Sequence, residues 1–521
     1  MKQKILLLFI FILTTCPFFA QKEANNWFFG NNQGMSFSTT QTLNNITTIR
    51  NGVIQTNQTM NAIPTYITGP INTWEGCFSI SDKDGNFLFA SDGISVYGRD
   101  LALMTHGSGL KGHPSASQSG IVIPRPDHPS RYYIITVPAA EGARNAIHYY
   151  EVDMLARGGL GDVLEPYSGS TPIGTALNFN GIYNTTNTYE NVTAVGHSNG
   201  RHFWLVHRCR QYFFVWLVTE DGINSTPTYQ FDAGIDLGAS IGYGYAKFSA
   251  DGKYIAHASR SGERLTIAEF DNSTGTISNI KTAIYNYLHL NITMYDVEFS
   301  PNNKYLFVSY VPTGYLIRLL VNDHMQDVSQ TPVILRNMDV TNIQMGPDNR
   351  IYGRGNSATI SGSINYRDLF IINEPNNDEP NLAIVPNYFL AGRTSQYVVS
   401  LPTFTSSFFG TLNLENDPLY PCVNENVTFS IKINNGTGEN AITRFEWEFG
   451  DGSPIKTETD MNQVIFSQNH TYKKRGTYKV ILTPYKADNT IVQDKIQTVD
   501  VKVSSCRLPV NHNISVMGYY D

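Results

Sequence analysis

The chain of 521 residues is long enough for more than one domain, and only 16% of it is charged, against roughly 25% in typical soluble domains. A formal net charge of -7 without clusters of Lys and Arg excludes a surface that tracks nucleic-acid phosphates. Asn, Thr, Ser, Gly and Tyr replace the missing charges, a composition typical of exported all-β proteins.

Residues 1–20 have the pattern of a secretory signal peptide. Two lysines precede an apolar run over residues 5–13, and cleavage is expected near Ala20. The run is shorter than the roughly 20 residues needed to cross a membrane, and no later segment is apolar enough to do so. Cys16 suggests a lipoprotein as an alternative, but Thr15 stands where lipid modification requires a smaller residue. We therefore expect a secreted or outer-surface protein that is soluble after cleavage.

Residues 244–259, GYAKFSADGKYIAHAS, predict a strand, a tight turn and a second strand. Phe248 ends the first strand, Asp251 and Gly252 lie in the turn, and residues 254–258 alternate on the second strand. One such hairpin cannot bury its own face. A ring of hairpins can, and their repetition every 40–50 residues or so indicates a β-propeller.

Five further segments share the pattern of strand, polar turn and strand. They are residues 75–93, 119–137, 191–208, 295–310 and 341–355. The turn residues Gly200, Gly252, Asn303 and Asn349 are 52, 51 and 46 positions apart by subtraction, close to one blade. Insertions between the repeats leave six or eight blades open beside the predicted seven. A β-sandwich or unrelated hairpins are the alternative, although neither would normally repeat this pattern.

Closure of the ring is predicted from the first strands after the signal peptide. Residues 27–38 resemble residues 87–97 in having an Asn/Gly or Asp/Gly turn between two strands. Propellers commonly complete one blade with a strand from the other end of the chain, which protects an exposed edge. We therefore expect residues 27–38 to join a strand around 397–404 in one composite blade. A seven-bladed β-propeller would then span residues 21–409.

A second, smaller all-β unit is predicted after the propeller. Residues 410–419 have the composition of a linker, the second unit runs from 420 to 507, and residues 508–521 form a short tail. Within it, Trp447 and Phe449 share one face of a strand, and Tyr478 and Val480 are expected to supply the facing layer.

Two motifs of this unit closely resemble the PKD domain, which implies an immunoglobulin-like β-sandwich. The first is FEWEFGDGSP at residues 445–454, and the second is NHTYKKRGTYKVILT at residues 469–483. The matching residues are Trp447, Phe449, Gly450, Asp451, Gly452, His470, Tyr472, Gly476, Tyr478 and Val480.

Three other segments resemble exported proteins of gliding or type IX-secreting Bacteroidetes-type bacteria, in which a propeller precedes PKD domains. They are residues 26–31, 74–86 and 400–404. The resemblance implies a surface protein linked to gliding motility or type IX secretion, with secretion machinery as a partner. Members of that group usually end in a sorting domain, whereas this chain stops at Asp521, which leaves the export route and the anchor open.

Cysteine positions predict one disulfide in the second unit. Cys422 and Cys506 bracket that unit, and an exported protein meets an oxidising environment. Cys77 and Cys209 lie in the first and third repeats, which are not neighbours in a ring, so their Cα atoms should exceed the limit of roughly 7 Å. We expect these two to be small buried hydrophobic residues.

Metal and cofactor sites are not predicted. Zinc-ligand residue types gather at His197, His202, His207 and Cys209, but their spacing matches no usual ligand pattern. Asx residues at the hairpin turns cap the backbone, which is a more common role there than calcium binding. These turn residues are Asp251, Asn303, Asp348 and, in the second unit, Asp451.

Catalytic motifs are also absent from the sequence. We find no nucleophile elbow, no HExxH sequence and no sialidase box, and the two glycine pairs at 109–112 and 158–161 lack a phosphate-binding context. Because loops of several blades can build a propeller active site, an enzyme is not excluded.

The sequence favours a non-enzymatic binding or adhesion protein. In this interpretation the propeller is an interaction platform for a protein or glycan at the cell surface, and the PKD unit is a spacer. The alternative is a secreted glycoside hydrolase or lyase with its site at the propeller channel. The ligand and the residues that bind it stay open.

Overall fold

The computed structural model confirms an all-β chain. It describes residues 22–505 except 141–145, 184–187, 199–201, 239–241, 261–263, 285–292, 312–314, 328–331, 338, 357–366, 390–399, 410–414, 418–420, 433–441, 462–464 and 493–495. Helical structure in these residues is confined to η1 (Lys22–Ala24), α1 (Ala156–Gly159), α2 (Val321–Gln326) and η2 (Ser406–Phe409). None of the described helices has the length and hydropathy of a membrane span. The expected signal peptide and tail lie outside the described residues.

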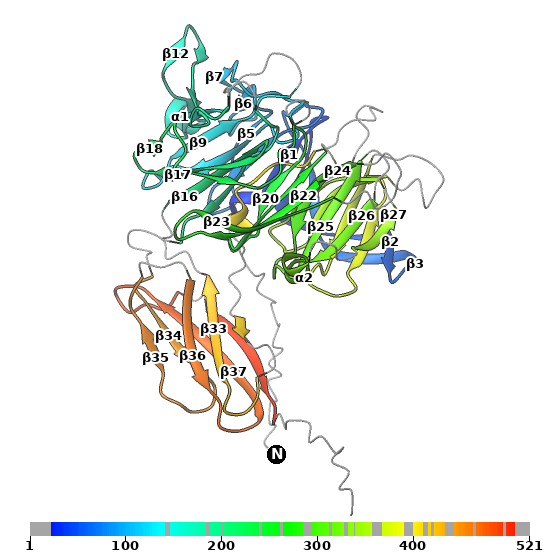
Figure 1. Cartoon of the computed structure of the whole chain (residues 1–521), viewed down its shortest axis with the longest axis vertical. Helices are drawn as coiled ribbons and strands as arrows, with labels where there is room; N and C mark the ends of the chain where they lie inside the picture. The colour runs from blue at the N-terminus through cyan, green and yellow to red at the C-terminus, as the bar shows by residue number, and fades with distance from the viewer. Residues whose placement is uncertain are drawn as a thin grey trace, which may run out of the picture.

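Strands before residue 410 form a β-propeller (Figure 1). In the described part of the chain they make six antiparallel sheets of at least four strands. The first sheet contains β4 (Phe78–Ser81), β5 (Phe87–Ser91), β6 (Ser95–Tyr97) and β7 (Leu103–Ser108). The second contains β8 (Gly120–Pro124), β9 (Arg131–Thr136), β10 (His148–Asp153), β11 (Asp162–Val163) and β14 (Thr175–Ala176). The third contains β15 (Thr193–Gly196), β16 (Phe203–Cys209), β17 (Tyr212–Thr219), β18 (Gly222–Ile223) and β19 (Tyr229–Asp232). A separate ribbon pairs β12 (Tyr167–Ser168) with β13 (Thr171–Pro172).

The other three sheets continue the same order along the chain. The fourth sheet contains β20 (Ala246–Phe248), β21 (Tyr254–Ser259), β22 (Arg264–Asp271) and β23 (Thr276–Ile284). The fifth contains β24 (Thr293–Phe299), β25 (Tyr305–Val311), β26 (Tyr315–Leu320) and β27 (Val333–Asn337). The sixth contains β28 (Asp339–Met345), β29 (Ile351–Asn356), β30 (Asp368–Asn373) and β31 (Asn381–Val385), and N-terminal strands are added to this sixth sheet. Each of the six repeats predicted from the sequence therefore supplies the first two strands of a sheet.

Neighbouring sheets pack face to face, and this explains why their strands are apolar on both faces. Alternate residues of a strand point to opposite faces. On β16, Leu205 packs into the core shared with the sheet of β8 and β9, whereas Trp204 and Val206 pack into the core shared with the sheet of β20–β22. The inner strands β4, β8, β15, β20, β24 and β28 contact one another in that order.

The predicted Asx turns are present in the hairpins. In the repeat at 244–259, the Asp251 carboxylate accepts a hydrogen bond from the Lys253 amide, 3.0 Å away, and Gly252 has a φ of 73°. In the next repeat, Asn303 has a φ of 59°, while Asn302 rather than Asn303 accepts from the backbone amide two residues on. Asp348 accepts from the amide of Arg350. These side chains stabilise turns.

The N-terminal strands close the ring differently from our prediction. β1 (Asn26–Phe29) pairs with the start of β2 (Gln33–Arg50), which pairs along its length with β3 (Val53–Thr68). β1 also lies against β4, and the far end of β2 pairs with β31, matching Ile49 with Leu382. β2 therefore belongs to the sheet of β28–β31. The three-stranded part around β1 lies where a seventh blade is expected, and the count of seven stays a prediction.

The second unit is a two-sheet sandwich, drawn in orange apart from the propeller in Figure 1. One sheet contains β32 (Glu415–Asp417), β33 (Asn426–Lys432) and β36 (Ile465–Thr471); the other contains β35 (Lys456–Glu458), β34 (Arg444–Glu448), β37 (Gly476–Tyr485) and β38 (Gln497–Val503). Trp447 and Phe449 are buried as predicted.

One expectation for this core is wrong. β37, which carries Tyr478 and Val480, pairs with β34 in the same sheet, so these residues do not face Trp447 from the opposite layer. Phe429 and Tyr472 of the β33/β36 side take that place: the Phe429 ring centroid is 5.4 Å from that of Phe449, and Tyr472 donates a hydrogen bond to the Phe449 carbonyl over 3.0 Å.

Candidate functional site

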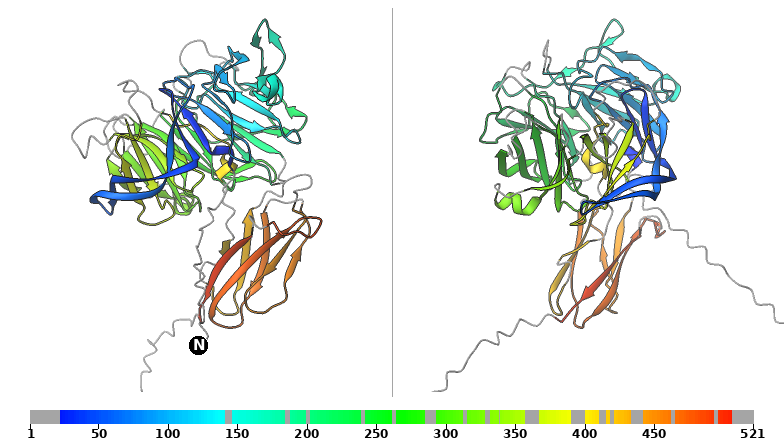
Figure 2. Two further views of the ribbon diagram at one scale, coloured as in Figure 1. Left: turned by 180° about the vertical axis from the view of Figure 1, so that it is seen from behind. Right: turned by 90° about the vertical axis from the view of Figure 1, so that its right-hand side faces the viewer.

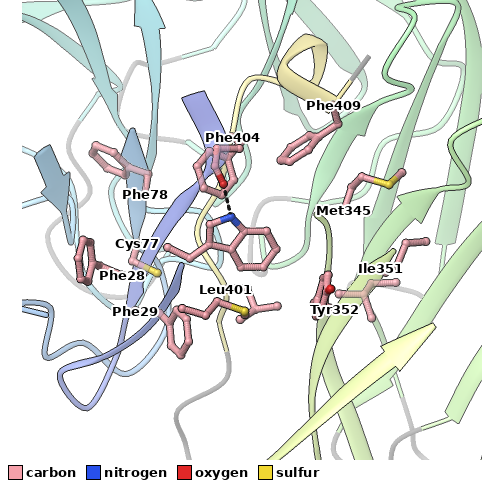
Figure 3. Close-up of a cluster of buried hydrophobic side chains, with 14 of the residues drawn as sticks. Phe28, Phe29, Cys77, Phe78, Met345, Ile351, Tyr352, Leu401, Phe404 and Phe409 are labelled. Carbon is pink, nitrogen blue, oxygen red and sulfur yellow. Dashed lines mark hydrogen bonds between the residues drawn. The ribbon is translucent and has the colours of Figure 1, made fainter. Parts of the chain in front are cut away.

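The centre of the propeller is filled by the chain itself. Residues 400–409 are all buried and run down between the inner strands. Figure 3 shows Leu401, Phe404 and Phe409 of this segment between a strand that carries Phe78 and strands that carry Met345 and Tyr352. We call residues 400–409 the plug.

Hydrogen bonds attach the plug to several sheets. The Thr403 amide donates to the Cys77 carbonyl beside β4 over 2.9 Å, and the Thr405 hydroxyl donates to the Val122 carbonyl of β8 over 2.7 Å. The Ser407 hydroxyl accepts from the Gly196 amide of β15 over 3.1 Å. The described part of the strand that we expected at 397–404 therefore plugs the channel. Its one backbone pairing among the described residues is an isolated parallel β-bridge between Thr403 and Phe78. It forms no composite blade with residues 27–38, so that prediction is wrong for these residues.

A buried charge cluster lies beside the plug. Lys247 Nζ on β20 is 3.1 Å from Asp296 Oδ1 and 3.3 Å from Glu298 Oε2 on β24. The amides of Ile343 and Met345 donate to these carboxylates over 2.9 and 2.8 Å. The cavity at this cluster has a volume of about 10 Å³, which is enough for one water molecule. The cluster holds β20, β24 and β28 together and has no room for a substrate.

Stability of the propeller should depend on pH through this cluster. Burial, opposed by Lys247, raises the pKa of Asp296 to about 7, and burial also raises the pKa of Glu298. The folded state therefore binds protons more readily than the unfolded state, in which Asp has a pKa of about 3.9. The stability that this contributes is complete below about pH 4 and is lost as the pH rises towards about 7.

We expect the free energy of unfolding of the Asp296→Asn variant to fall less between about pH 4 and about pH 7 than that of the wild type. Urea unfolding at several pH values measures both slopes. Equal slopes would show that Asp296 titrates as it does in the unfolded chain.

The mouth of the channel, where the inner strands begin, carries two carboxylates that are engaged in structure. Glu75, just before β4, accepts a hydrogen bond from the Tyr295 hydroxyl over 2.8 Å and from the Ser115 hydroxyl over 3.0 Å. Burial, and then the Glu75 charge, raises the pKa of Tyr295 well above its usual value. The Tyr295 hydroxyl therefore remains a proton donor to Glu75 rather than a base.

Glu190 joins two sheets at the same mouth. It is fully buried and accepts from the Ser117 amide over 2.8 Å, from the Ser117 hydroxyl over 3.0 Å and from the Ala140 amide over 2.6 Å. Ser117 precedes β8 and Glu190 precedes β15. Three donors on one carboxylate fix its position, as a structural residue requires.

Trp74, the residue before Glu75, has a large exposed side chain. It is 56% exposed, and its neighbours in the chain are held firmly: the Thr73 hydroxyl and the Glu75 amide both donate to the Pro114 carbonyl, over 2.6 and 3.2 Å. An indole on a fixed backbone suits stacking on a sugar ring or an apolar side chain. Sequence inspection included Trp74 in a family-like motif but did not identify it as a site, because no local pattern marks a tryptophan as exposed.

The four side chains considered for zinc do not gather at one point, although the His197 and His202 rings contact each other with centroids 6.0 Å apart. His207 and Cys209 are buried on β16, where His207 contacts the Asn191 carbonyl over 2.6 Å. His202 instead pairs with Glu220 over 2.9 Å, and the His197 ring stacks on Trp204 with centroids 5.2 Å apart. Among the residues that the structure describes, no three His, Cys, Asp or Glu side chains form a metal-binding group.

The cysteines follow the predicted division as far as the structure describes them. Cys77 and Cys209 are both buried, and neither is disulfide-bonded. The backbone of Cys422 forms an isolated parallel β-bridge with that of Ser504, two residues before Cys506. Cys506 itself lies outside the described residues. The disulfide between Cys422 and Cys506 stays a prediction.

Asp451 has the expected turn role and one further contact. Its carboxylate accepts from the Ser453 amide over 3.1 Å and is 2.8 Å from His470 Nε2. The His470 ring stacks on Phe449 with centroids 4.2 Å apart. Two residues of the predicted PKD motifs therefore contact each other across the sandwich.

Comparison with known proteins identifies one part of the chain. Residues 411–490 match the model of the PKD domain, which confirms the resemblance seen in the sequence. A search of curated proteins found no match.

Solved structures similar to the chain include a propeller and an extracellular domain. The Dos1 propeller has a TM-score of 0.39 and 8% identity, with 79% of this chain and 90% of that chain covered. A protein from Lactobacillus plantarum has a TM-score of 0.38 and 10% identity, with 65% and 94% covered. The extracellular domain of a one-component system from B. thetaiotaomicron has a TM-score of 0.33 and 10% identity, with 92% and 56% covered.

Proposed function

We propose that the protein is an exported, non-enzymatic binding protein of the cell surface. The propeller is a rigid platform for a protein or glycan, and the PKD unit is a spacer. The observation that carries the proposal is the plug, because a channel filled by buried side chains from 400–409 leaves recognition to the rim and the outer surfaces.

The carboxylates at the channel mouth support binding over hydrolysis. A general acid or base needs a proton that can move to or from the substrate. Glu75 and Glu190 instead accept hydrogen bonds from the protein's own hydroxyls and amides. They hold loops in place, and the exposed Trp74 beside them offers a contact surface.

Export and the cellular role belong to the same proposal. Signal-peptide cleavage near Ala20 would deliver the chain to an oxidising compartment. A link to type IX secretion or gliding motility rests on the sequence resemblance of residues 26–31, 74–86 and 400–404.

The Trp74→Ala variant tests whether the channel mouth is the binding surface. The mature protein is incubated with purified polysaccharides and with outer-surface protein extracts, and both retention and release of reducing ends are measured. We expect retention without product release, and an affinity about tenfold lower in the variant, as for an aromatic contact residue in an interface. Tyr229→Ala, an exposed aromatic residue on β19, is the control and should bind as the wild type does.

Two results would contradict this proposal. Wild-type protein that is retained by none of the probes has no such binding function under these conditions. Reducing-end release that survives purification and disappears in Glu75→Gln would establish the alternative, a polysaccharide-degrading enzyme at the channel mouth.

A further inference from the structure

β2 and β3 form a long curved arm on the propeller. Register shifts interrupt their pairing at four places between Ser36 and Thr48, and Asn45, Asn57 and Ala62 have positive φ angles. Such bulges bend and twist a two-stranded ribbon. The root of the arm therefore lies beside β1 while its far half lies along β31, and Figure 2 shows the blue arm reaching the yellow-green strands.

The bent arm and the adjoining sheet enclose an open groove of about 690 Å³. This volume lies in the usual range for small-ligand sites, roughly 300–1,000 Å³. The sheet order β30, β31, β2, β3 is continuous through hydrogen bonds. The groove is lined by the β2–β3 ribbon, by Asn373 on β30 and Asn381 on β31, and by Arg350.

Side-chain amides dominate this lining. Six of the twelve lining residues are Asn or Gln, two are Thr, and only Val53 and Met60 are apolar. Each amide offers both a donor and an acceptor, which is what a ligand covered with hydroxyl groups requires. Asn373 and Asn381 lie opposite each other on β30 and β31, and Gln55 and Gln58 lie on β3.

The charged groups around the groove are already compensated by the protein. Arg50 forms an ion pair with Glu374, and Asn51 donates to Glu379. Arg350 donates to the Ala62 carbonyl over 2.9 Å and lies 3.7 Å from Asp348. A bound anion would compete with these acceptors for the arginines, whereas a neutral ligand leaves the pairs intact.

We propose that this groove binds a neutral, hydroxyl-rich oligosaccharide segment. The inference rests on the proposed binding function and gives it a second site and a ligand class. The amides recognise sugar hydroxyls, and Val53, which is exposed, contacts the apolar face of a sugar ring. An acidic glycan is disfavoured because no uncommitted positive group lines the groove in the residues described here.

Two double variants test the groove from opposite walls. Asn373→Ala/Asn381→Ala removes the amides of β30 and β31, and Gln55→Ala/Gln58→Ala removes those of β3. Gln468→Ala, on β36 of the PKD unit, is the matched control for loss of an amide. None of these side chains is fully buried, so each variant should fold as the wild type does, and circular dichroism verifies this.

Binding is measured by affinity electrophoresis in mannan, xylan, laminarin and dextran as neutral probes, and in polygalacturonate and chondroitin sulfate as anionic probes. We expect retardation in at least one neutral probe, an affinity at least tenfold lower in both groove variants, wild-type behaviour of Gln468→Ala, and little dependence on salt. Retardation only by anionic probes, with steep salt dependence, would overturn the inference.

The outcomes also separate the groove from the general function. Neutral-glycan binding that is lost in Trp74→Ala but kept in both groove variants would place the glycan at the channel mouth and refute the groove. Retention of a surface protein without any glycan binding would refute the groove while the platform function stands. Absence of every interaction would contradict both.

Discussion

Replacing Trp27 with alanine is expected to lower the free energy of unfolding of the propeller by about 3–5 kcal/mol, the usual cost of removing a buried Trp. The indole is fully buried and donates to the Ala24 carbonyl over 2.7 Å. Its ring lies 6.0 Å from that of Tyr352 on β29 and 5.6 Å from that of Phe404 in the plug. The loss would therefore weaken the junction of the first strand, a blade and the plug together.

The free energy of unfolding of the propeller alone is measured from the hydrogen exchange of the β4 and β29 amides at several urea concentrations. Trp74→Ala is the matched control, because its side chain is 56% exposed, and a surface substitution usually changes stability by about 0.5 kcal/mol or less. A Trp27 variant as stable as the Trp74 variant would mean that ring closure does not depend on this junction.

Loss of the predicted disulfide between Cys422 and Cys506 should destabilise the PKD unit by about 4–5 kcal/mol, because the bridge would close a loop nearly as long as the unit. The ends of the unit are already adjacent: the Val423 amide donates to the Ser504 carbonyl over 2.9 Å, and the Ser504 amide donates to the Pro421 carbonyl over 3.0 Å. Backbone hydrogen bonds therefore join the two ends of the unit, and in the chain-entropy model the bridge acts chiefly on the unfolded chain.

Exchange of the β34 and β37 amides measures this change in the Cys422→Ser/Cys506→Ser variant. A reducing agent should destabilise the wild type to a similar extent and leave the double variant unchanged. Mass spectrometry without reduction should show one linked peptide pair with both cysteines. Alkylation of both cysteines without prior reduction would disprove the bridge.

Local features of the fold were predictable from local residues. The hairpin at 244–259 depends on alternation and on an Asx turn closed within six residues, where the Ser249 amide donates to the Tyr254 carbonyl over 2.9 Å. The same holds for the PKD turn, in which Asp451 accepts from Ser453. Such patterns repeat along the chain, so their number and spacing indicated a propeller.

The candidate sites were less predictable. Trp74 and Glu75 belong to a segment that was identified for its resemblance. The contacts of Glu75, however, depend on Tyr295 of β24 and on Pro114 in the loop between β7 and β8, both distant in the sequence. The Asn and Gln residues that line the groove show no recognisable pattern in the sequence. They become a lining only because bulges bend β2 and β3 towards β31.

The sequence by itself determined the all-β class, the repeated hairpins and the PKD motifs, because each arises from turn chemistry and side-chain alternation among nearby residues. Only the tertiary structure decided how the ring closes, what fills its channel and where a groove forms. Those features depend on contacts such as that from Thr405 to Val122, 283 positions apart, and that from Arg354 to Gln33, 321 positions apart. Contacts at such separation leave no local pattern in the sequence, because many apolar or amide-bearing segments of similar shape could make them. The packing of the whole ring decides which segment does.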